Sequence, residues 1–101
     1  MNTNNVTGTG TNSTQLGDNA CAFSQESVSI GQNSIAGKSI EIQNPYSVAI
    51  GYSSNSSGRS SISIGNESSS SSLGAISIGN ECKTSESGAI AIGYKSNASE
   101  I

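Results

Sequence analysis

The sequence predicts an all-β fold, a parallel solenoid of about six coils with about 14 residues in each. Three observations predict it. Short segments that alternate small and β-branched residues recur along the chain, a glycine follows each of them, and the last four of these glycines recur with a constant period of 14. Self-similarity at a fixed period is typical of solenoids, in which each coil is stabilised by stacking on its neighbours.

The composition excludes an ordinary globular core. Hydrophobic residues make up 32% of the 101 residues, against about 45–50% in a typical domain. Ser, Asn and Gly, which are abundant here, are among the weaker helix formers. The chain is nevertheless not expected to be disordered, because most of its Ile residues fall in the recurring pattern and its net charge is only -3.

Several functions are also excluded. The four Lys and Arg residues are spread singly, which argues against a nucleic-acid partner. No apolar run approaches the roughly 20 residues of a membrane span, and the N-terminus shows no signal-peptide pattern. The chain has no His and its acids are dispersed, so we expect no catalytic residue, no bound metal and no cofactor.

The first strand of each coil lies just before its glycine. Alternation with a period of two indicates a strand with one buried face, and we expect the larger side chains to be the buried ones. Glycine then ends the strand, since it adopts a positive φ without steric cost. The expected core ladder is Val28, Ile30, Val48, Ile50, Ile62, Ile64, Ile76, Ile78, Ile90 and Ile92, and the expected coil turns are Gly17, Gly31, Gly51, Gly65, Gly79 and Gly93.

The small residues between the ladder positions are expected to point outward. Their row suits close packing of several solenoids against one another, and we take it as the candidate trimer face: Ser29, Ala49, Ser63, Ser77 and Ala91. A second strand follows each glycine. Its inward side chains are expected to be the small residues three and five positions after the glycine, such as Ser68 and Ser70.

The chain is expected to form one solenoid over residues 13–101, preceded by an N-terminal extension at 1–12. The interval from Gly31 to Gly51 exceeds the period of 14 by six positions. Within it, Ser39–Gln43 imitates a strand but lacks the glycine. Either an extra coil or an enlarged one would explain this interval. We favour a coil enlarged at about 35–46, because an extra coil would leave too little chain for two strands and two turns.

The motif [SA]-[VI]-[AS]-I-G-x-x-[SA] resembles the YadA-like head repeat of trimeric autotransporter adhesins. Five good copies and one weak copy cover about Ser13 to Ala98. The resemblance implies a left-handed parallel β-roll that assembles as a homotrimer. It also implies a non-enzymatic, structural or adhesive part of a fibre on a cell or virion surface, with a host or matrix molecule as a further partner.

A ligand-binding solenoid, for ice or for glycans, is the alternative function. Tyr52 and Tyr94 follow motif glycines and are the candidate surface contacts. Cys21 and Cys82 are four or five coils apart, about 20 Å, which is too far for an intrachain disulfide. We also expect head-to-tail stacking of subunits, with residues 1–12 supplying a strand to the end coil of the next subunit.

Overall fold

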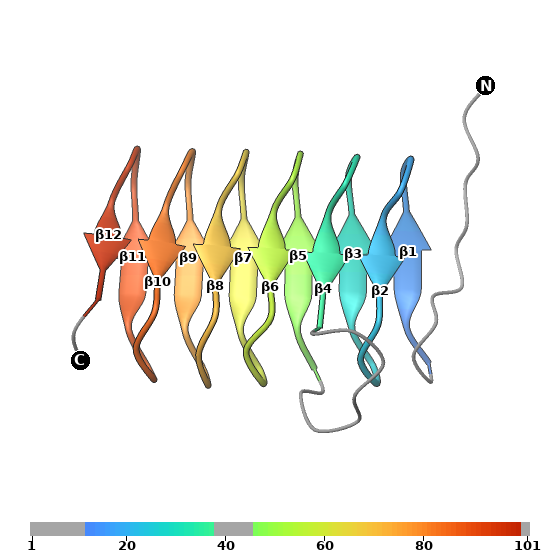
Figure 1. The fold of residues 1–101 in the computed structure, drawn as a ribbon, viewed down its shortest axis with the longest axis horizontal. Helices are drawn as coiled ribbons and strands as arrows, with labels where there is room; N and C mark the ends of the chain where they lie inside the picture. The colour runs from blue at the N-terminus through green and yellow to red at the C-terminus, as the bar shows by residue number, and fades with distance from the viewer. Residues whose placement is uncertain (1–11, 38–45, 100–101) are drawn as a thin grey trace.

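The computed structural model describes residues 12–37 and 46–99, and within them the chain forms strands and turns without a helix. Each coil contributes one three-residue strand and one two-residue strand (Figure 1). The three-residue strands form sheet A: β1 (Thr14–Leu16), β3 (Val28–Ile30), β5 (Val48–Ile50), β7 (Ile62–Ile64), β9 (Ile76–Ile78) and β11 (Ile90–Ile92). The two-residue strands form sheet B: β2 (Cys21–Ala22), β4 (Ile35–Ala36), β6 (Asn55–Ser56), β8 (Ser69–Ser70), β10 (Lys83–Thr84) and β12 (Asn97–Ala98).

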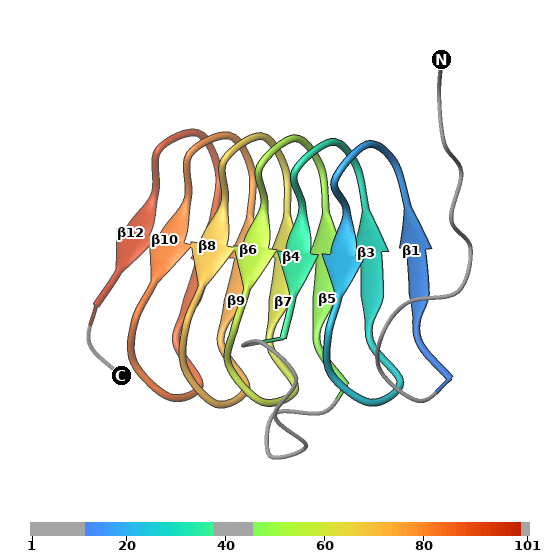
Figure 2. The ribbon, with the colours of Figure 1, turned by 45° about the vertical axis from the view of Figure 1, so that its right-hand side comes forward.

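Both sheets are parallel, and every strand pairs with its counterpart in the adjoining coil (Figure 2). Ser63 lies opposite Ser77, which is the register that the glycine spacing predicts. The solenoid of about six coils is therefore confirmed. β3 pairs directly with β5 across the longer interval, with Ser29 opposite Ala49. Residues 38–45 of the expected enlargement and 1–11 of the expected extension lie outside the described residues.

The interior of the solenoid is lined by small side chains, and the predicted direction of the core ladder was wrong. The Val and Ile side chains of the ladder point outward from sheet A and are half-buried or exposed. The row expected on the outside is instead inside: Ser29, Ala49, Ser63 and Ser77 are 0% exposed, and Ala91 is 3% exposed.

The interior is too narrow for a side chain as large as that of Ile. The Ser29 Oγ atom of sheet A is 2.7 Å from Ser34 Oγ, just before β4 of sheet B. Ser63 and Ser68 meet in the same way at 2.8 Å. One pair of hydroxyl groups thus spans the gap between sheets, whereas sheets that pack through larger side chains lie about 10 Å apart. The Val and Ile side chains of sheet A therefore face outward.

The inward residues of sheet B are small, as predicted. Ser54, Ser68 and Cys82 are each 0% exposed, and the neighbouring inward positions of the inner coils are at most 2% exposed. Burying a hydroxyl is costly unless it is hydrogen-bonded. Here the interior hydroxyls bond across the gap or to turn carbonyls, as Ser34 does to the Gly31 carbonyl at 2.9 Å. Within the described residues, the one buried side-chain oxygen or nitrogen that lacks a partner is Asn55 Oδ1.

The motif glycines are required for two separate reasons. Gly31, Gly51 and Gly93 have φ values of +124° to +128°, a region that side-chain-bearing residues rarely adopt. In addition, successive glycines stack closely: a Cβ atom on Gly51 would lie 2.5 Å from the Gly65 carbonyl oxygen. A Cβ on Gly93 would meet no atom within 4 Å. The two positions therefore separate backbone strain from steric exclusion.

We predict that Gly51→Ala destabilises the solenoid more than Gly93→Ala. Both variants suffer the strain of the positive φ, about 1–3 kcal/mol. Only Gly51→Ala also collides with the next coil, which adds about 1–3 kcal/mol by analogy with overpacked cores. Urea unfolding followed by circular dichroism measures both losses, and equal losses would contradict the close stacking of the glycines.

We also predict that Ser63→Leu destroys the fold. The substitution replaces a side chain that fits a one-hydroxyl gap, and overpacking costs at least about 1–3 kcal/mol even in roomier cores. Ser69→Leu is the matched control, because Ser69 faces outward on β8 and is only half-buried. Circular dichroism should show loss of the β signal for Ser63→Leu alone. A folded Ser63→Leu protein would mean that the interior is wider than described.

Candidate functional site

The outer side of sheet A is a continuous apolar surface, here called the apolar face. It is formed by the alternating Val and Ile positions of five successive strands. The inner members are half-buried, while Ile90 and Ile92 in the last coil are 59% and 65% exposed. Its residues are Val28, Ile30, Val48, Ile50, Ile62, Ile64, Ile76, Ile78, Ile90 and Ile92.

The apolar face contains no charged residue, because no charged residue occurs in any strand of sheet A. Large contiguous apolar patches on soluble proteins usually mark a contact with another molecule. The strands pair in register from coil to coil, so the side chains recur about every 4.8 Å along the solenoid. The face is thus a regular array that a second array of the same spacing can match.

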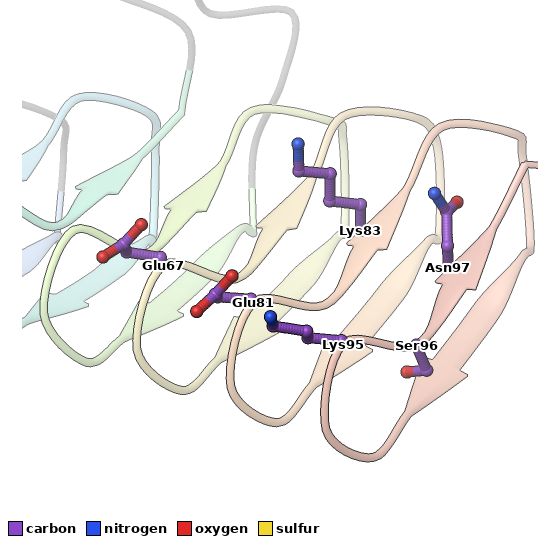
Figure 3. A pocket seen from close by; sticks show the side chains of 6 residues that line it. All are labelled: Glu67, Glu81, Lys83, Lys95, Ser96 and Asn97. Atoms are coloured by element: carbon purple, nitrogen blue, oxygen red, sulfur yellow. The ribbon is translucent and has the colours of Figure 1, made fainter.

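A polar cavity of about 340 Å³ lies on the opposite side of the roll, over sheet B and the turns before it (Figure 3). Glu67, Glu81 and Lys95 come from three successive turns, ahead of β8, β10 and β12. Lys83 comes from β10. Ser96 and Asn97, at the start of the last coil's second strand, complete the lining.

The coil period brings these side chains together. Glu67, Glu81 and Lys95 follow one another at the period of 14, so they occupy the same position of consecutive turns. That position has a left-handed backbone, with φ values of 57°, 60° and 56°. Lys83 and Asn97 are likewise register partners in β10 and β12. Two adjacent rows of polar side chains therefore line the cavity.

The charged side chains that line the cavity form no close ion pairs with one another in the described structure. Among the residues that the structure describes, no ion pair or hydrogen bond engages the side chains of Glu67, Glu81 or Lys83. Lys95 Nζ lies 5.3 Å from the centre of the Tyr94 ring, in a cation–π contact. The cavity therefore offers two carboxylates as acceptors and two ammonium groups as donors.

The candidate surface contacts are exposed but separate. Tyr52 is 50% exposed and Tyr94 is 70% exposed, each directly after its motif glycine. Three coils separate them, which is about 14 Å, so the structure does not bring them into one site. Cys21 is half-buried on the outer side of β2, Cys82 is buried in the interior, and both are free thiols.

Metal and membrane chemistry find no support in the described part of the chain. Residues 12–37 and 46–99 contain no group of three or more His, Cys, Asp and Glu side chains that could hold a metal ion. In the same ranges, no helix is long and apolar enough to cross a membrane.

The chain matches the model of a known protein family. The YadA head domain repeat (2 copies) matches residues 9–36, 44–68, 56–81 and 85–100, which together are well over half of the sequence. The chain belongs to this family. YadA heads are structural adhesin modules rather than enzymes, which agrees with the resemblance seen in the repeat motif. No curated protein matches the chain.

The sequence also contains signals for the apolar face and for the polar cavity, which the expectations above did not use. The position occupied by Ser29 is Ser or Ala in every good copy, whereas the position before it is Val or Ile and the position after it is always Ile. Strict restriction to the smallest side chains indicates a confined interior. For the cavity, the signal is the constant spacing of Glu67, Glu81 and Lys95, three residues that count only as dispersed surface charge when each is considered alone.

Proposed function

We propose that this β-roll is an adhesive module of a surface fibre and that three copies pack through their apolar faces around a common axis. The observation that carries the proposal is the charge-free apolar face on the outside of sheet A. The interior gains little from hydrophobic burial, because it holds Ser and Ala. Burial of the Val and Ile side chains between copies supplies what the single roll lacks, at roughly 25 cal/mol per Å² of apolar surface.

Copies of the same chain suit this face better than an unrelated partner. Each copy carries the same ladder at the same rise of about 4.8 Å, so the side chains of one can interdigitate with those of another along the full length. YadA-like heads form trimers in autotransporter adhesins, which favours three copies over two. The row predicted from the sequence as the trimer face is buried inside each roll, so it plays no part in this contact.

The trimer would leave sheet B and its turns on the outside. These surfaces carry the charged and hydroxyl side chains, including those of the polar cavity. A host or matrix molecule would meet the fibre there. YadA-like adhesins lie on the cell surface, and we propose the same extracellular location, on a cell or virion, for this chain.

Two further expectations are affected by the structure. An ice-binding solenoid would have to expose the row of Ser29, Ser63 and Ser77 to water, but this row is buried. An ice-binding function through that row is therefore not proposed. Head-to-tail stacking was expected to use residues 1–12, and residues 1–11 lie outside the described residues.

We predict that Ile64→Asp converts the trimer into monomers. Its carboxylate would lie at the centre of the apolar face and would lose hydration on assembly without gaining a partner, which costs several kcal/mol per ion. Native mass spectrometry at micromolar concentration should show a trimer for the original chain and a monomer for the variant.

Ser69→Asp is the control for this experiment, because it places the same charge on the outer side of sheet B. It should remain trimeric, and both variants should keep their β circular dichroism. A monomeric original chain, or loss of the trimer in both variants alike, would contradict assembly through the apolar face.

Adhesion itself is tested with beads coated with the 101-residue chain. The beads should attach to surfaces coated with extracellular matrix more strongly than beads coated with Ile64→Asp, because trimers present three outward sheets at once and gain avidity. Equal attachment of the two bead populations would argue against an adhesive role for the assembled module.

A further inference from the structure

We infer that the polar cavity is a binding site for a neutral glycan, and this inference rests on the proposed adhesive function. Its volume of about 340 Å³ falls within the range of about 300–1,000 Å³ that is typical of small-molecule sites. Such sites are usually lined mostly by apolar groups. This one is lined by two carboxylates, two ammonium groups, a hydroxyl and an amide. An apolar ligand therefore has no matching surface in it.

The balance of charge argues against a ligand of a single sign. An anionic ligand attracted by Lys83 and Lys95 would be repelled by Glu67 and Glu81, and a cationic ligand would meet the reverse arrangement. The signs are also mixed along the roll, because Glu81 and Lys83 belong to the same coil. The carboxylates and ammonium groups are therefore not gathered at opposite ends of the cavity, as a ligand with one positive and one negative end would require.

A polyhydroxylated ligand matches what remains. A sugar hydroxyl can donate a hydrogen bond to a carboxylate and accept one from an ammonium group at the same time. The side chains of Glu67, Glu81 and Lys83 have no partners of their own in the described structure, so they are available for such bonds. Hydrogen bonds to charged groups are among the stronger ones in proteins, which suits a small and solvated ligand.

The surroundings of the cavity fit a chain of sugars that runs along the solenoid. Glu67 and Lys95 are two coils apart, about 10 Å, so the row of turns is longer than one pyranose ring. Tyr94 stands beside Lys95 at the last turn and is 70% exposed, although it does not line the cavity and the Lys95 ammonium lies over its ring. The cavity lies on the side of the roll away from the apolar face, so trimer assembly and glycan binding do not compete.

The experiment uses the 101-residue chain on a printed array that carries neutral, sialylated and sulfated glycans, followed by titration calorimetry with a neutral tetrasaccharide that gives a signal. Glu81→Gln and Lys83→Gln each remove one charged hydrogen bond and should weaken binding by about ten-fold or more. Glu86→Gln is the matched control. It makes the same chemical change at an exposed turn residue that does not line the cavity, and it should bind like the original chain.

Three outcomes would overturn the inference. They are the absence of any signal from neutral glycans, signals confined to the sialylated or sulfated glycans, and equal weakening by Glu86→Gln. Saturable binding of phosphocholine that Glu81→Gln abolishes, without neutral-glycan binding, would assign the cavity to a dipolar ligand instead. The mass of the trimer is measured on the same samples, so that a trimeric chain without glycan binding refutes only this inference.

Discussion

The contact of hydroxyl groups across the interior governs the architecture of this roll. Ser29 and Ser34 touch through their Oγ atoms, and the same contact recurs between Ser63 and Ser68. A gap of this width admits Ser, Ala, Cys or Thr and nothing larger. The buried hydroxyl groups of the interior all have hydrogen-bond partners in the described structure. The polar interior therefore avoids the free-energy cost of burying a hydroxyl without a hydrogen bond. Within the described residues, the larger apolar side chains are consequently displaced to the outside.

This displacement explains how a chain with few hydrophobic residues can keep them available for the proposed assembly. In an ordinary domain, the Ile residues would be consumed by the core. Here the core is built from hydrogen bonds between coils and between sheets, and sheet A leaves its Ile residues on the outer surface. The fold and the proposed assembly therefore depend on different residues of the same strand. Ser63 belongs to the fold, while Ile62 and Ile64 belong to the surface.

The turns between the strands accept a wider range of side chains than the interior does. Each motif glycine is fixed by its positive φ and by the glycine stacked on it, but the next two residues point into solvent. One of these positions accepts Asn33, Glu67 or Lys95 despite its left-handed backbone, a conformation that costs such residues about 1–2 kcal/mol. Because the coils stack in register, any side chain placed there becomes part of a row. The polar cavity arises where such a row contains both signs of charge.

The sequence by itself determined the class of fold, the length of the coil, the register and the family. The constant glycine spacing and the alternation in segments such as Ser61–Gly65 are sufficient for these, because a parallel solenoid repeats in space with the period that it has in sequence. It also indicated which positions of sheet B face inward. Small residues such as Ser68 and Ser70 recur three and five positions after each motif glycine, and these two are buried in the structure.

Only the tertiary structure decided which side of sheet A is the inside. A strand that alternates Ser and Ile has the same period in either orientation, and the usual rule that the larger apolar side chain is buried gives the wrong answer here. The answer depends on the distance between two sheets, which follows from how the turns close each coil and not from any single strand. The cavity depended on the tertiary structure for the same reason: Glu81 and Lys83 are neighbours in the sequence, but Glu67 and Lys95 reach them only through the stacking of coils.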